Sequence, residues 1–287
     1  MASYNVKLLD YGGTRQIRRY GANITKKESE YVEQYDMEYT PDGGYVMKKR
    51  RMVDVTPKQK RQSDDYTKEE KEKIISERPE FWKEKKLREN TNRAKGKIYE
   101  IARANVWEWF ITLTFNPQIV NSTDYDRVKC VTSDFFHAMR KKYAPDLKYL
   151  IVPEFHLDGK KYHFHGILSN IGDMPMHDSG LTFNSKVVYN LQTWRFGFST
   201  ATQVTDTRKV ASYITKYITK ELCVVTDGRH RYLNSSNCER PKVYEYNMSS
   251  EEYFESLEGV YDNIGYMKTI KIPYTKNKVE YIEIDDF

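Results

Sequence analysis

Two short segments carry the side chains that could do chemistry: residues 162–166 (YHFHG) and residues 213–220 (YITKYITK). The first places two histidines two positions apart in an apolar run that reads as a strand, so both rings leave the same face. The second places two tyrosines four positions apart in a helical pattern, so they share one face of a helix. Imidazoles can bind a divalent metal and a tyrosine can act as a covalent nucleophile. Together the segments suggest phosphotransfer chemistry.

A third metal ligand can be found on the strand that precedes the histidines. Glu154 lies nine residues before His163, and an antiparallel pairing would bring its carboxylate beside the rings of His163 and His165. Two imidazoles and one carboxylate leave coordination positions open for a phosphate oxygen. His156 would share a face with Glu154 and is a rival or helper ligand. The alternative is a pair of half-buried strand histidines without a metal.

The tyrosine segment is predicted to be one helix, from about Asp206 to Cys223. Tyr213 and Tyr217 adjoin its apolar stripe, and a lysine follows each of them by three positions. These lysines are Lys216 and Lys220. A phenol with a pKa of about 10 is a poor nucleophile at neutral pH, and a neighbouring ammonium favours the phenolate. The alternative is an amphipathic helix with tyrosines at the edge of the core and solvated lysines.

The surrounding pattern predicts an α+β fold, with a central antiparallel sheet and helices on one face. A helix is expected over residues 66–106, interrupted near Pro79. After it come, in order, a strand at 109–115, a helix N-capped within 122–124, strands at 147–155 and 162–169, a loop or small insertion at 170–190, a strand at 193–204, the tyrosine helix, and a further strand near 229–233.

The two ends of the chain differ in charge from each other. Residues 48–62 and 83–97 each carry seven basic residues, against one and two acidic residues respectively. Residues 251–287 carry four lysines and nine acidic residues. A basic front with an acidic tail is typical of nucleic-acid binders, and the basic runs are expected to contact DNA phosphates. Solvated charged helices are the alternative.

We therefore expect three segments. Residues 1–90 form a basic N-terminal extension, irregular up to about residue 65 and then helical; residues 91–240 form the main domain; residues 241–287 form an acidic tail. Alternation at 31–39 and 44–55 is compatible with short strands within the extension.

Composition excludes several classes. The net charge is +6, 39% of residues are apolar and 31% are charged. No stretch approaches the ~20 apolar residues of a membrane span, and the first ten residues lack the features of a signal peptide. The three cysteines, Cys130, Cys223 and Cys238, indicate neither a disulfide framework nor a zinc ribbon. An intracellular, reducing compartment fits best.

Three motifs, in this order, resemble those of HUH-superfamily rolling-circle replication initiators. They are residues 110–115 (FITLTF), Glu154 with 163–165 (HFH), and 213–217 (YITKY). The doubled tyrosine looks like the version in phage initiators related to the gene A and gene II proteins, and in some plasmid and mobile-element initiators. Residues 194–197 (WRFG) are also similar to phage initiators, and the resemblance covers about residues 90–240.

The resemblance implies a ferredoxin-like HUH endonuclease domain that nicks and rejoins single-stranded DNA at an origin. A tyrosine would attack a phosphate bound by Mg²⁺ or Mn²⁺, leaving a 5′-phosphotyrosine and a free 3′-OH that primes synthesis. Carried over by position, the metal ligands would be Glu154, His163 and His165. The nucleophiles would be Tyr213 and Tyr217, with Lys216 and Lys220 as phosphate or metal helpers.

The expected partners are an origin single strand and the replication proteins of the host. The chain has no G-x-x-x-x-G-K-[ST] motif, so a host helicase is expected to act beside a host polymerase in the cytoplasm of a bacterial cell. The alternatives are an HUH transposase or relaxase, although relaxases usually present three clustered histidines, and a non-catalytic DNA-binding protein on the same fold. A zinc hydrolase would leave the tyrosines unexplained.

Overall fold

A computed structural model describes residues 3–25, 31–39, 45–54, 67–155, 161–226, 228–272 and 277–285. The chain divides into two compact units: Ile74–Lys242, and Met1–Lys73 together with Val243–Phe287. Helices and antiparallel sheets make up the described parts of the chain, so the predicted α+β class is confirmed. Of the helices within the ranges above, none is both long and apolar enough to span a bilayer.

A seven-stranded antiparallel sheet forms the centre of the larger unit, in the order β11-β6-β7-β5-β10-β9-β8. Its strands are β5 (Trp109–Leu113), β6 (Lys148–Phe155), β7 (Tyr162–Ser169), β8 (Met176–Phe183), β9 (Lys186–Leu191), β10 (Ser199–Gln203) and β11 (Leu233–Asn234). In β7 every residue except His163 is buried, which explains why this strand reads as a nearly continuous apolar run.

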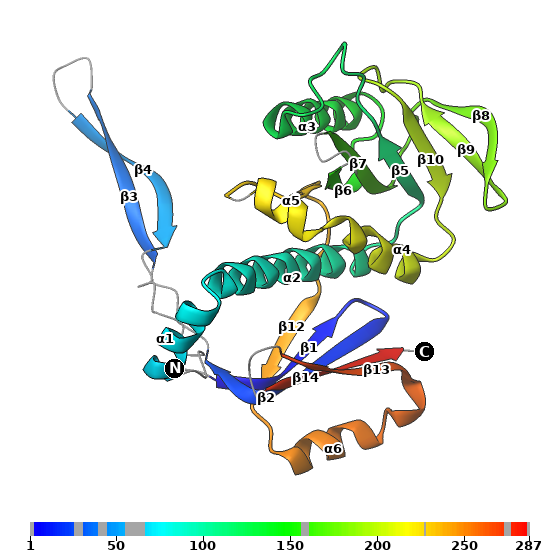
Figure 1. The fold of residues 1–287 in the computed structure, drawn as a ribbon. Coiled ribbons are helices and arrows are strands. Elements are labelled where there is room, and N and C mark those ends of the chain that lie inside the picture. Colours follow the sequence, from blue (N-terminus) through cyan, green and yellow to red (C-terminus); the bar gives the residue numbers. More distant parts are fainter. Residues whose placement is uncertain are drawn as a thin grey trace. The chain divides into compact units, whose positions relative to one another are not determined.

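Helices cover both faces of this sheet, and the expectation that they share one face is wrong (Figure 1). The helices of the larger unit are α2 (Phe81–Arg103), α3 (Tyr125–Lys142), α4 (Thr207–Ile214) and α5 (Lys220–Val225), and α1 (Lys68–Glu77) precedes them. On one face Phe136 of α3 stacks on Tyr149 of β6. On the other, Phe110 of β5 contacts Tyr213 of α4. Both strands carry apolar side chains on both faces, so the sheet needs helices on both sides.

Several local predictions are confirmed and two are corrected. The break near Pro79 separates α1 from α2, and the side chain of Asp124 caps α3 by accepting a hydrogen bond from the backbone N–H of Arg127. Residues 176–191, expected in a loop, instead form the hairpin β8–β9 at the edge of the sheet. The strand expected at 193–204 is shorter, because β10 begins only at Ser199.

The smaller unit corrects the expectation of an irregular N-terminal arm. Its five-stranded antiparallel sheet has the order β12-β1-β2-β14-β13, so strands from the two ends of the chain pair directly. The elements are β1 (Ser3–Asp10), β2 (Thr14–Thr25), β12 (Lys242–Tyr246), α6 (Ser250–Glu258), β13 (Ile264–Lys271) and β14 (Lys278–Asp285). Tyr253 and Leu257 of α6 pack against Val6, Ile282 and Ile284. The acidic segment is therefore folded structure, because it supplies part of this core.

A separate two-stranded sheet confirms the short strands predicted from alternation. It consists of β3 (Tyr31–Tyr39) and β4 (Tyr45–Asp54), paired antiparallel. The rest of the basic stretch 48–62 lies outside the described residues.

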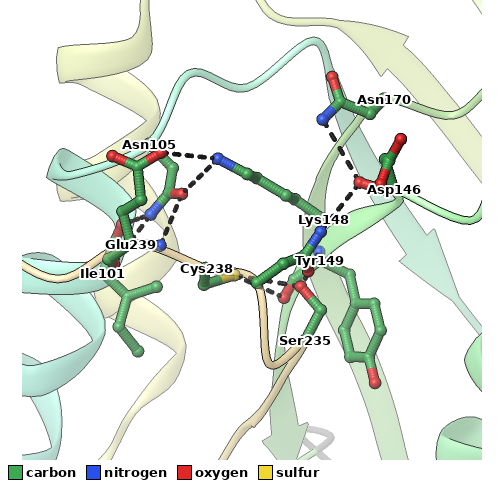
Figure 2. A network of polar contacts seen from close by, with 10 residues as sticks. Ile101, Asn105, Asp146, Lys148, Tyr149, Asn170, Ser235, Cys238 and Glu239 are labelled. Atoms are coloured by element: carbon green, nitrogen blue, oxygen red, sulfur yellow. Dashed lines mark hydrogen bonds and ion pairs between the residues drawn. The ribbon is translucent and has the colours of Figure 1, made fainter.

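A polar network holds the segment after β11 against the larger unit (Figure 2). The ammonium of Lys148 on β6 lies 3.2 Å from Oδ1 of Asn105, just after α2, and 3.2 Å from Oε1 of Glu239. Asn105 also accepts from the backbone N–H of Glu239, at 3.0 Å. Further along, the backbone N–H of Tyr149 donates to Oγ of Ser235, at 3.1 Å. These contacts fix the end of β6 that lies away from Glu154.

The turn between β9 and β10 is pinned to the end of β5. Nε1 of Trp194 donates to the carbonyl of Thr114 at 3.1 Å, and the indole packs against Phe115. A Cβ atom on Gly197 would lie 2.3 Å from the carbonyl oxygen of Thr114 and 2.8 Å from the backbone nitrogen of Asn116. Only glycine allows this close approach of two backbones.

We expect Gly197→Ala to destabilise the larger unit by about 1–3 kcal/mol, because the added methyl group must displace backbone. Gly96→Ala is the matched control, since a Cβ there meets nothing within 4 Å and alanine favours the helix. Urea unfolding of the full chain, followed by far-UV circular dichroism, measures both. Equal stability of the two variants would show that the turn is loosely held.

Candidate active site

The hairpin of β6 and β7 brings Glu154 and the two histidines to one face of the sheet. Glu154 lies directly opposite His163 in the pairing, and Val152 lies opposite His165. Side chains two positions apart on a strand share a face, so the three candidate ligands are neighbours. His156, the fourth candidate, lies outside the described residues.

The ring of His165 is fixed on both nitrogens. Nε2 lies 2.7 Å from Oε2 of Glu154, and Nδ1 lies 3.1 Å from Oγ1 of Thr112 on β5. A carboxylate only accepts, so Nε2 carries the proton, and in the neutral ring Nδ1 then accepts from the threonine hydroxyl. Hydrogen bonding to His165 lowers the pKa of the Glu154 carboxyl despite partial burial, and the nearby charges of His163 and Lys216 act in the same direction.

The structure leaves metal binding by these side chains a prediction. Across the described part of the chain, no group of three or more His, Cys, Asp or Glu side chains has an arrangement that could hold a metal ion. Glu154 instead pairs directly with His165. His163, half-buried, takes part in interactions of its own.

The tyrosine segment is not the single helix that the sequence predicts. α4 ends at Ile214, a 3₁₀ turn covers Thr215–Tyr217, and α5 starts at Lys220. Between them Ile218 is extended, and the side chain of Thr219 caps α5 by accepting from the backbone N–H of Leu222 at 3.1 Å. The cap starts a new helix and changes the direction of the chain.

This break separates the environments of the two tyrosines. The side chain of Tyr213 on α4 is 45% exposed, whereas Tyr217 is only 6% exposed. The ring of Tyr217 stacks on His165, with centroids 3.7 Å apart and planes 10° from parallel. The two tyrosine rings remain in edge-to-face contact, at 5.7 Å. Tyr217 therefore supports the histidine ring, and Tyr213 faces solvent.

The phenols also differ in acidity. Burial raises the pKa of Tyr213, but hydrogen bonds from Lys216 and Tyr217 outweigh it, so this pKa lies below the ordinary 10.0. Burial, followed by the hydrogen bond to Tyr213, raises the pKa of Tyr217 well above its usual range. The ammonium of Lys216 lies 3.4 Å from the centroid of the Tyr213 ring. Tyr213 is the phenol that ionises more readily.

The two candidate lysines are placed differently. Lys216 is exposed and contacts Tyr213, and its charge reaches Glu154. Lys220 is the exposed first residue of α5, where its charge lowers the pKa of Glu221. None of the contacts described for Lys220 reaches the histidines or the tyrosines.

Sequence reasoning missed two residues of the site, Thr112 and Phe110. Thr112 orients His165, and the ring of Phe110 lies between His165 and both tyrosines, with centroids 5.4–6.4 Å away. Both belong to the strand FITLTF, on which alternate residues face the histidines. That alternation is visible in the sequence, but it does not say which face carries the site.

Comparison with known proteins follows the same segment. Residues 108–222 match the family model of the replication-associated protein ORF2/gene II protein. The stretch runs from β5 through the tyrosines, so the resemblance to replication-associated proteins is confirmed there, consistent with a rolling-circle replication initiator. No curated protein and no solved structure matches the chain.

We expect Lys216→Met to raise the pKa of the Tyr213 phenol, because it removes both the donor and the charge that lower it. With ¹³C-labelled tyrosine, NMR titration follows the phenol carbon of Tyr213 directly. Lys209→Met, which removes an exposed lysine paired with Asp206, should leave that midpoint in place. An unchanged midpoint in Lys216→Met would mean that the lysine does not act on the phenol.

Proposed function

We propose that this chain is a replication initiator that nicks and rejoins single-stranded DNA at an origin, starting rolling-circle replication. One observation carries the proposal: an exposed tyrosine with a lowered pKa lies beside a lysine, on the sheet face that carries a carboxylate and two histidines. The match to a replication-associated family supports the same role. Such a protein would act in the cytoplasm of a bacterial host.

Tyr213 is the nucleophile in this proposal. Its phenolate oxygen attacks the scissile phosphorus, the bond from phosphorus to the 3′ oxygen breaks, and that oxygen takes a proton to become a free 3′-OH. The 5′ end stays on the tyrosine as a phosphodiester. Rejoining is the reverse attack, by a 3′-OH on the phosphotyrosine. Between the two steps the free 3′-OH primes a host polymerase, with a host helicase opening the duplex.

Lys216 serves both the nucleophile and the phosphate. Its ammonium favours the phenolate of Tyr213 before attack, and positive charge at this position stabilises the additional negative charge of the transition state. Lys220 lies farther along the chain, beyond the break at Thr219, and would help through contacts to more distant phosphates.

Tyr217 orients the nucleophile in this arrangement. It is buried, stacks on His165 and donates a hydrogen bond to Tyr213. For Tyr217 to attack a second phosphate, it would have to leave this stack. A cycle with two alternating nucleophiles therefore requires rearrangement of residues 215–219.

The donor set of Glu154, His163 and His165 fits a divalent cation such as Mg²⁺ or Mn²⁺. A carboxylate oxygen already faces an imidazole nitrogen, so a cation held by both would take the place of the hydrogen bond between them. When bound, the cation would polarise the scissile phosphate. Thr112 would keep the ring of His165 in the orientation that presents Nε2.

We expect Tyr213→Phe to abolish the covalent protein–DNA adduct. Tyr217→Phe should still form it, roughly tenfold more slowly, because one hydrogen bond to the nucleophile is lost. The assay incubates each variant with a labelled random pool of single-stranded DNA and Mn²⁺ and resolves the products on a denaturing gel. Adduct formation by Tyr213→Phe at the wild-type level would refute the assignment, and circular dichroism checks that both variants fold.

The exposed basic residues of α2 give a second prediction. Lys86, Arg93 and Lys97 are exposed and lie on one side of the helix. If they contact DNA phosphates, replacing all three by Gln lowers the log–log salt slope of single-strand binding by about 2, at ~0.7 for each contact. The same change at Lys141 and Lys142, exposed on α3, is the control. Equal slopes for the two variants would show that the α2 residues are only solvated.

A further inference from the structure

The face that carries the candidate active site continues across β5 to the start of β10. Thr112 of β5 pairs with His165 on one side and with Thr200 of β10 on the other. One step along, the backbone N–H of Thr114 donates to the carbonyl of Phe198 at 2.8 Å. Ser199 and Ala201 are buried, so the alternation puts Phe198 and Thr200 on the opposite face, with the histidines.

Phe198 is a large apolar side chain held in the open. It is 56% exposed, although the residues around it are firmly anchored. Its backbone N–H donates to Oγ1 of Thr114 at 3.1 Å, and its neighbour Gly197 touches the backbone of β5. Among the aromatic pairs of the described residues, none includes Phe198. The ring is therefore a rigidly mounted apolar surface with a free face.

We propose that Phe198 is a base-binding subsite, on which one nucleobase of the single strand stacks next to the phosphate attacked by Tyr213. This inference rests on the proposed function, because it places the strand across the same face. Exposed aromatic rings bind single strands through the flat faces of the bases, and cations nearby hold the phosphates. Continuity with the site favours a nucleobase as occupant: the cationic Lys216 lies on that face, and the threonine hydroxyls between them offer polar contacts.

Single-strand binding tests the subsite first. The probe is a fluorescein-labelled thirty-nucleotide oligo-dT, and anisotropy gives the dissociation constant. Phe198→Ala should weaken binding by roughly tenfold, while Phe198→Trp should preserve or tighten it. Phe183→Ala is the matched control, because Phe183 is 66% exposed at the end of β8 and should change binding by less than about twofold.

A second experiment locates the base. Single-stranded substrates recovered from the covalent adduct are resynthesised with one abasic position at a time on either side of the cleaved phosphate. Wild-type binding should weaken at one position, and Phe198→Ala should be insensitive at that position alone. Binding by Phe198→Ala equal to that of Phe183→Ala, or the same abasic profile in wild type and Phe198→Ala, would overturn the subsite.

The two proposals fail separately. If wild type forms no covalent adduct with any strand, the nicking function fails, and the oligo-dT measurement still decides whether Phe198 binds bases. If wild type forms the adduct but Phe198→Ala binds oligo-dT as wild type does, nicking stands and the subsite is wrong. Thermal unfolding should be unchanged in Phe198→Ala, because an exposed ring contributes little to the core.

Discussion

The ring of His165 is the constraint on which the candidate site depends. One nitrogen meets Glu154 of β6, the other meets Thr112 of β5, and one ring face stacks on Tyr217. Three strands and the 3₁₀ turn are thereby tied to one side chain. Because Tyr217 in turn bonds to Tyr213, the position of the exposed phenol is set by contacts that begin in the sheet. Orientation of this kind holds reacting groups close to the geometry that the reaction needs.

The break in the tyrosine helix converts two similar residues into different ones. In a continuous helix, two tyrosines four positions apart would have comparable surroundings. The extended Ile218 and the cap at Thr219 end that regularity, so Tyr217 turns into the core and Tyr213 stays at the surface. Burial and hydrogen bonding then move the two pKa values apart, and pairs of titratable groups separated in this way mark assigned chemical roles.

Local patterns in the sequence were sufficient for much of the larger unit. The hairpin of Glu154 and the histidines follows from alternation, and the break at Pro79 follows from the chemistry of proline. The pairing of β2 with β14 could not be predicted, because nothing local links residues more than 250 positions apart. The helix break was missed because the apolar stripe continues through it: Ile218 and Leu222 are fully buried in either arrangement. Which face of FITLTF carries the site likewise depends on packing.

The central claim is that Tyr213 becomes covalently linked to DNA at a metal site formed by Glu154, His163 and His165. Peptide mapping of the wild-type adduct by mass spectrometry, after incubation with single-stranded DNA in Mn²⁺ or in EDTA, tests it most directly. We predict a nucleotide on the peptide that contains Tyr213, attached at that residue, in Mn²⁺ and no adduct in EDTA. Attachment at Tyr217, or an undiminished adduct in EDTA, would contradict the account.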